Sequence, residues 1–110
     1  MSSQEIIVLA PAGRLDASGA RPMEAELATR ITAGQVHLVV DLTQVRYISS
    51  NGLRVLLVAL KNAQKQNGAL ALCGLSPRLM EIFEMAGFDR VFQIFETREQ
   101  ARLSMNSSNQ

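Results

Sequence analysis

The chain has 110 residues, 47% of them hydrophobic, and its 11 basic and 10 acidic side chains leave a formal net charge of +1. This length and apolar content predict a single domain with its own core and exclude a largely disordered chain. The balanced charge provides no broad basic surface of the kind that binds nucleic acid or an anionic membrane, so we expect no direct partner of either kind.

Targeting and redox features indicate the cytoplasm. No apolar run reaches the roughly 18 residues of a membrane-spanning helix, so we expect no membrane insertion. The first residues lack the cationic start and apolar core of an export signal. Cys73 is the only cysteine, which excludes an internal disulfide, and its apolar neighbours predict a buried side chain.

The first part of the chain alternates apolar runs with turn residues. Pro11 interrupts the first run, and Gly34 follows a segment whose apolar residues recur at helical spacing. The next run is continuously apolar, as in strands that are covered on both faces. The elements expected here are strands at 5–10 and 14–16, a helix at about 20–33 and a strand at 35–41.

A connection at 42–48 is expected next, with Val45 and Ile48 turned inward. A long helix then runs from about Ser50 to Gln66, with its core stripe formed by Leu53, Leu56, Leu57, Leu60 and Ala63. Val58 lies outside this stripe and is open to packing or to a partner. The remaining elements are a strand at 69–73, a helix that Ser76 caps and Pro77 begins, a strand at 91–95 and a final helix capped by Thr97.

This order of elements predicts an α/β fold. Strands that alternate with helices through short connections form a mostly parallel, mixed β-sheet, here of about five strands with about four α-helices. The pattern leaves open whether the helices lie on one face of the sheet or on both. We expect one domain over residues 1–104 and a disordered polar tail over 105–110.

The sequence offers no support for an enzyme. It has no glycine-rich phosphate loop, no nucleophile elbow, and no cysteine, histidine and carboxylate cluster with metal spacing. His37 alternates with apolar residues, so we interpret it as a residue of the sheet. We therefore expect a protein without catalytic residues, metal or cofactor.

A polar corner, Ser49-Ser50-Asn51-Gly52, separates the apolar strand region from the long helix. One serine can cap the helix by accepting a hydrogen bond from a free backbone N–H. A cap needs only one hydroxyl, however, and glycine in a helix costs about 1 kcal/mol relative to alanine. We therefore expect Gly52 to allow the close approach of another surface.

A phosphate is compatible with this corner. On Ser50 it would carry about −1.5 to −2 charges, which the free N–H groups at a helix start favour. The domain would stay folded, and the charge would act on a docked partner. A penalty of about 3 kcal/mol would weaken binding roughly 150-fold.

Four motifs together resemble the STAS domain (sulfate transporter and anti-sigma factor antagonist), and most of all the free-standing bacterial anti-sigma factor antagonists. These motifs are Gly13-Arg14-Leu15-Asp16, Val39-Val40-Asp41-Leu42 followed by Ile48 to Leu57, Leu75-Ser76-Pro77, and Met85-Ala86-Gly87-Phe88. The commonest family pattern at the corner is Asp-Ser-Ser-Gly-Leu. This chain has Ser49 in place of the acid and Asn51 before the glycine.

The resemblance implies a phosphorylation-switched binding module. Such a module binds an anti-sigma factor, a GHKL-type serine kinase, and is released when the kinase phosphorylates the serine that matches Ser50; a PP2C-type phosphatase reverses this. Ser49 is a minor alternative acceptor. Asp16 matches an acidic residue near the partner-binding face, or else serves the turn before the first helix. The partner-binding residues expected are Asp16, Ser49, Ser50, Asn51, Gly52, Arg54 and Val58.

Two other functions stay open at this point. A structural STAS subunit, such as a component of a lipid-transport ATPase or a signalling scaffold, would dock through the same helix without a phosphorylation switch. Binding of a small ligand or nucleotide is a third hypothesis, although no phosphate loop supports it.

Overall fold

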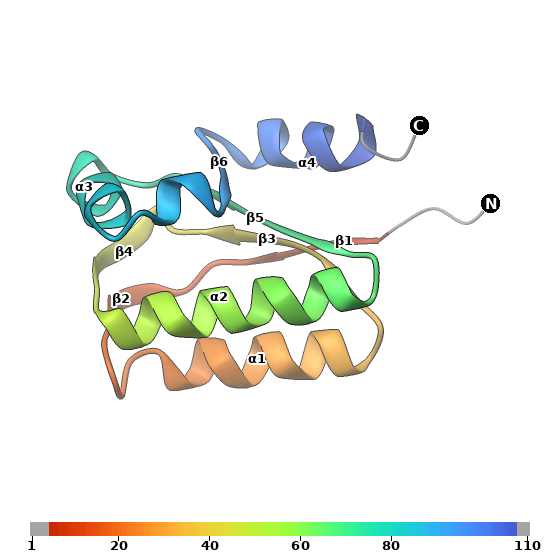
Figure 1. Cartoon of the computed structure of the whole chain (residues 1–110), viewed down its shortest axis with the longest axis horizontal. Coiled ribbons are helices and arrows are strands. Elements are labelled where there is room, and N and C mark those ends of the chain that lie inside the picture. Colours follow the sequence, from red (N-terminus) through yellow and green to blue (C-terminus); the bar gives the residue numbers. More distant parts are fainter. Residues whose placement is uncertain (1–4, 108–110) are drawn as a thin grey trace.

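The computed structural model describes residues 5–107. It confirms the α/β class (Figure 1). The elements are β1 (Ile6–Leu9), β2 (Ala12–Leu15), α1 (Arg21–Thr32), β3 (His37–Asp41), β4 (Gln44–Ile48), α2 (Ser50–Lys65), β5 (Ala69–Cys73), α3 (Pro77–Met85), the 3-10 turn η1 (Phe88–Arg90), β6 (Gln93–Phe95) and α4 (Arg98–Ser107).

The strands form two parallel sheets rather than one mixed sheet. The larger has the order β1-β3-β5-β6, and the smaller pairs β2 with β4. Every pairing within the described residues is parallel. Two neighbouring parallel strands need a long connection between them, because the chain must run back to the end of the sheet where the first strand began. The helices between the strands provide these connections.

The prediction of a connection at 42–48 was wrong, because Gln44–Ile48 form strand β4. The described residues therefore contain six strands instead of about five. Burial along β4 alternates at first, with Val45 buried between exposed Gln44 and Arg46, and ends with Ile48 buried. Such a strand has one face on the core and one in solvent, so it lacks the continuous apolar run of β3.

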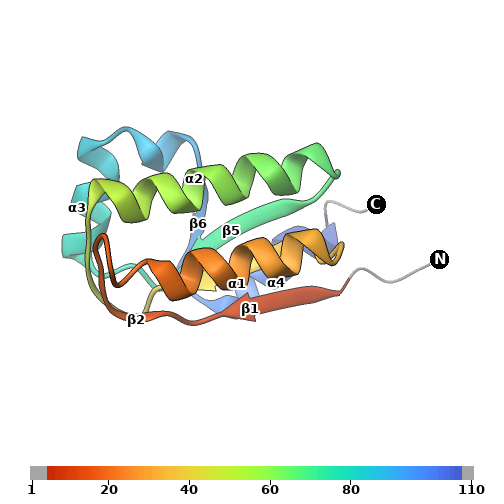
Figure 2. The same ribbon diagram turned by 90° about the horizontal axis from the view of Figure 1, so that it is seen from below.

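Helices cover both faces of the larger sheet. Helices α1 and α2 lie side by side on one face, and α4 packs on the other against β3, β5 and β6 (Figures 1 and 2). The side chains of β3 alternate accordingly: Leu38 and Val40 belong to the core under α1 and α2, while Val39 belongs to the core under α4. Helix α3 lies beyond this sheet, against β4 and η1. The start of α2 is therefore at the end of the molecule where α3 and the smaller sheet meet (Figure 1).

Helix α4 is joined to the sheet by a charged pair. The Arg98 Nε lies 2.6 Å from the Asp41 Oδ2, and the Thr43 N–H donates to the Asp41 Oδ1 at 3.0 Å. Burial raises the pKa of Asp41, but the hydrogen bonds from Thr43 and Arg98 outweigh it and hold this pKa below its usual range. Asp41 is thus an ionised structural residue of the sheet.

The C-terminal boundary differs from the prediction. Helix α4 continues to Ser107, and Met105 is 3% exposed in the core under it, so the folded region extends past residue 104. Residues 108–110 of the expected tail lie outside the described residues. Cys73 is buried in the same core, as predicted, and burial raises the pKa of its thiol to about 11. Among residues 5–107, no helix has the length and apolarity to cross a bilayer.

Candidate functional site

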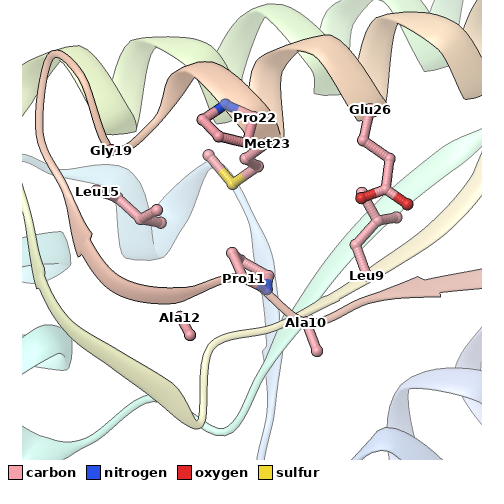
Figure 3. A pocket seen from close by; sticks show the side chains of 9 residues that line it. All are labelled: Leu9, Ala10, Pro11, Ala12, Leu15, Gly19, Pro22, Met23 and Glu26. Carbon is pink, nitrogen blue, oxygen red and sulfur yellow. The ribbon is translucent and has the colours of Figure 1, made fainter.

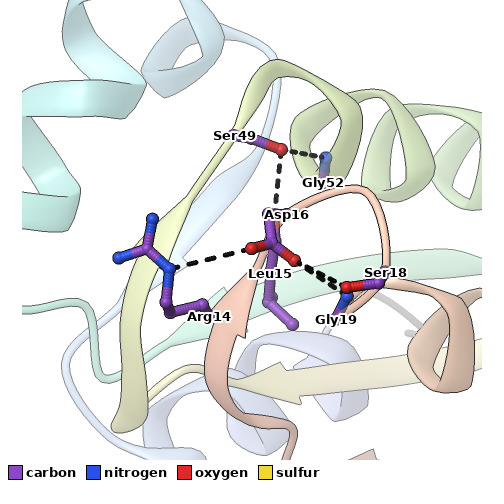
Figure 4. A network of polar contacts seen from close by, with 7 residues as sticks. All are labelled: Arg14, Leu15, Asp16, Ser18, Gly19, Ser49 and Gly52. Carbon is purple, nitrogen blue, oxygen red and sulfur yellow. Dashed lines mark hydrogen bonds and ion pairs between the residues drawn. The ribbon is translucent and has the colours of Figure 1, made fainter.

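Ser49 joins the start of α2 to the end of β2 (Figure 4). Its backbone is extended, and its hydroxyl accepts a hydrogen bond from the Gly52 N–H at 3.4 Å, so it is the N-cap of the helix. The same hydroxyl donates to the Leu15 carbonyl oxygen at 3.2 Å, and the Ser49 N–H donates to that oxygen at 3.1 Å. The Ser49 side chain is therefore a structural link between two elements.

Gly52 is buried at this link. A Cβ at this position would lie 2.5 Å from the Leu15 carbonyl oxygen and 2.7 Å from the Ile48 Cγ1. Real Cβ atoms do not approach other atoms so closely, so only glycine fits the first turn of α2 here. The close approach expected at Gly52 is present, and the surface that approaches its backbone is β2 of the same chain. Contact of Gly52 with a partner stays a prediction.

Ser50 is different from Ser49 in both exposure and bonding. It is the first residue of α2 and is exposed, whereas Ser49 is half-buried. Within the part of the chain that the structure describes, the Ser50 hydroxyl makes no hydrogen bond. Its oxygen is thus presented to solvent at the start of the helix. One turn further along, Arg54 is also exposed, and its Nη2 donates to the Asn51 Oδ1 at 2.7 Å.

Asp16 lies next to this corner because it directly follows Leu15 (Figure 4). Its Oδ1 accepts from the Gly19 N–H at 2.9 Å and from the Ser18 hydroxyl at 3.5 Å. The Gly19 hydrogen bond is the main cause that holds the pKa of Asp16 below its usual range. The N-cap of α1 is Ala20, so Asp16 shapes the turn before the helix without capping it.

Two residues that sequence reasoning missed extend the corner. Tyr47, from β4, has the Arg14 guanidinium 4.4 Å above its ring. Met85, at the end of α3, is 88% exposed although it is apolar. Both line a shallow groove of about 380 Å³ that also includes Ser50. The sequence places Met85 at the end of an amphipathic helix, which is the one pattern that could have indicated its exposure. That pattern was not sufficient, because the face that Met85 occupies depends on how α3 packs.

The site residues predicted from sequence fall into two places. Asp16, Ser49, Ser50, Asn51 and Arg54 are gathered at the corner by the link between β2 and α2. Val58 is 45% exposed further along α2, where it lines a hollow between α1 and α2 with Glu24 and Ala28. Ser50 and Arg54 are the exposed residues at the corner. Together with Tyr47 and Met85 they are called the corner surface below.

A second hollow lies under the start of α1 (Figure 3). Its volume is about 180 Å³, and Pro11 and Met23 contribute side chains to it from opposite sides. Among residues 5–107, Glu26 is the only charged side chain in its lining. This lining is unfavourable for a phosphate or nucleotide, because a carboxylate repels an anion.

The arrangement of a capped α2 start beside β2 agrees with the motifs noted in the sequence, and comparison with known families decides the assignment. The STAS domain matches residues 2–101. The chain belongs to the STAS domain family. Its relatives include BtrV of Bordetella bronchiseptica, named as an anti-sigma factor antagonist, with 38% identity over 87% of this chain and 83% of BtrV.

Other relatives of this STAS chain carry similar names. The anti-sigma-B factor antagonist of Listeria monocytogenes is 35% identical over 76% of this chain and 73% of its own length. Among solved structures, the Bacillus cell fate determinant SpoIIAA in its phosphorylated form has the same fold, with a TM-score of 0.70 and 22% identity over 92% of this chain and 91% of that structure.

Proposed function

We propose that this chain is an anti-sigma factor antagonist that is switched by phosphorylation of Ser50. In its unphosphorylated form it binds an anti-sigma factor, a serine kinase of the GHKL type, through the corner surface. The observation that carries the proposal is the contrast between the two serines: Ser49 is half-buried and bonded on both sides, while Ser50 is exposed and unbonded within the described residues. The names of the STAS relatives support the choice of partner.

Ser50 is the better acceptor for a physical reason. A phosphoryl group on the Ser49 oxygen would remove the proton that this oxygen donates to Leu15 and would crowd the link between β2 and α2. On Ser50 the kinase transfers the γ-phosphoryl group of ATP to the hydroxyl oxygen, which loses its proton, and ADP leaves. The product adds a phosphate to an exposed position where helix N–H groups favour an anion.

Release follows from the place of that phosphate. Ser50 shares the groove of the corner surface with Met85 and Tyr47. A partner that fills this groove would meet about −1.5 to −2 new charges at its edge. A penalty of about 3 kcal/mol lowers affinity roughly 150-fold. A PP2C-type phosphatase then restores the binding form, and we place this cycle in the cytoplasm.

The proposal is tested with two substitutions at Ser50. The chain is used to recover its kinase partner from the native cell, and affinity is then measured by calorimetry. Ser50→Asp should weaken binding at least tenfold, and Ser50→Ala should retain binding but accept no phosphate from ATP. The matched control is Ser76→Asp, which places the same charge at the start of α3 while aspartate preserves the cap.

Two results would contradict the proposal. Equal affinity of Ser50→Asp and wild type would instead fit a structural subunit that docks constitutively. Full phosphorylation of Ser50→Ala would move the acceptor to another residue, with Ser49 the first to examine.

A further inference from the structure

Arg54 is the cation nearest to Ser50 along α2. The two residues are four positions apart, which makes them neighbours on the helix surface. Both are exposed, and Arg54 donates to the Asn51 amide oxygen at 2.7 Å. The partner of this guanidinium is therefore a neutral side chain on its own helix, one position from the proposed phosphate.

We propose that Arg54 exchanges partners when Ser50 is phosphorylated, leaving the Asn51 amide and pairing with the phosphate. This inference rests on the proposed function. Hydrogen bonds between a guanidinium and a phosphate are roughly twice as strong as those between neutral groups, and two can form in parallel. The exchange needs only rotation of the Arg54 side chain, because the helix already places both residues on adjacent parts of one surface.

The surrounding charges favour this exchange. The first turn of α2 has no acidic residue that would compete for Arg54 or repel the phosphate. Arg14 is already engaged, with its Nε 3.7 Å from the Asp16 Oδ2 and its guanidinium over Tyr47. Arg54 is thus the cation on this helix that the phosphate recruits.

The exchange gives phosphorylation a second effect on the partner. The phosphate introduces negative charge, and it also withdraws a guanidinium that the unmodified corner surface presents. A partner that uses an acidic group against Arg54 therefore loses an attraction and meets a repulsion in the same step.

The test places phosphoserine at position 50 during protein synthesis, so that no kinase is required. The second pKa of the phosphate is measured by ³¹P NMR in the full chain and in Arg54→Gln, with Lys61→Gln as the control that removes an exposed cation further along α2. We expect Arg54→Gln to raise the phosphate pKa by about half a unit, the range of an exposed pair, and Lys61→Gln to change it much less.

A second measurement reports on Arg54 directly. The ¹⁵N chemical shift of its guanidinium should differ between the phosphorylated and unmodified chains. In the phosphorylated chain, Asn51→Ala should leave this chemical shift unchanged, because the Asn51 amide is no longer the partner of Arg54. Equal phosphate pKa values in the native chain and Arg54→Gln, both folded by circular dichroism, would overturn the exchange. That result would leave the proposed function intact, since Ser50→Asp tests it separately.

Discussion

Two helices of this protein begin in the same way but differ in what their starts offer to solvent. Ser49 caps α2 and Ser76 caps α3, each by accepting a hydrogen bond from the third helical residue. After the cap, α3 continues with Pro77, which has no polar side chain, whereas α2 continues with the free hydroxyl of Ser50. The capping serine is therefore a structural feature, whereas the second serine is the one that we propose to be functional.

The third helical residues sharpen this contrast. At α3 this residue is Leu79, which is fully buried in the core. At α2 it is Gly52, where even one added carbon would meet Leu15. The start of α3 is held by a side chain in the core, while the start of α2 is held by backbone contact with another strand.

Gly52→Ala should have the largest effect on stability. The added methyl group would clash with backbone and side-chain atoms that have no room to move. We therefore expect the free energy of unfolding to fall by about 2–3 kcal/mol, as for overpacked cores. Chemical denaturation measures it. Arg78→Ala, at an exposed position in the first turn of α3, is the control and should change stability by less than about 0.5 kcal/mol. Equal midpoints for Gly52→Ala and wild type would refute the backbone contact.

Ser49→Ala should cost more than Ser76→Ala. Removing a helix cap costs about 1 kcal/mol, which is the whole effect expected at Ser76. The Ser49 hydroxyl also donates to the Leu15 carbonyl oxygen, so Ser49→Ala should lower the free energy of unfolding by about 2 kcal/mol in total. Ser49→Asp should fall between these values, because a carboxylate caps the helix but has no proton for Leu15. A similar cost at both serines would mean that the link to β2 adds nothing.

The stability of the fold should also depend on pH through Asp16, in the turn between β2 and α1 beside the corner. The folded-state pKa of Asp16 is lowered, mainly by the Gly19 N–H, so its carboxylate stabilises the fold above the unfolded-state pKa. This stabilisation is lost as pH falls through the lower folded-state pKa. The melting temperature of Asp16→Asn should thus lie below that of wild type at pH 7, and the gap should close below about pH 4. A gap that is constant with pH would contradict this assignment.

Ser50→Ala should have the smallest effect on stability. Its hydroxyl has no hydrogen bond within the described residues and is exposed, so the change in unfolding free energy should be within about 0.5 kcal/mol. Thermal melting checks this. A larger loss would assign Ser50 to the fold and would weaken its contrast with Ser49.

Much of the fold could be predicted from local sequence signals. Ser76-Pro77 predicted the start of α3, and the continuous apolar run that ends at Asp41 predicted a strand covered on both faces, where the structure has β3. Strand β4 was missed because only one of its faces is apolar, and because its partner β2 is short and contains Gly13. Its alternation of exposed and buried residues was readable, but it spans too few positions to outweigh the polar composition.

The candidate site was only partly predictable for a different reason. The choice of the serine-rich corner came from the residues themselves and from the family resemblance. The distinction between Ser49 and Ser50 depends on a bond to Leu15, which is 34 positions away in sequence. The role of Gly52 depends on the same residue. Contacts of this range follow from strand register, which no local pattern in the chain specifies.

The Leu15 carbonyl has a consequence for how this surface can vary. This single oxygen receives both hydrogen bonds from Ser49 and also closes the space beside Gly52. Because it belongs to the main chain, no substitution at position 15 can delete it. Substitutions at the exposed residues around the corner can therefore change what a partner meets, while this main-chain oxygen keeps the geometry that presents the Ser50 hydroxyl.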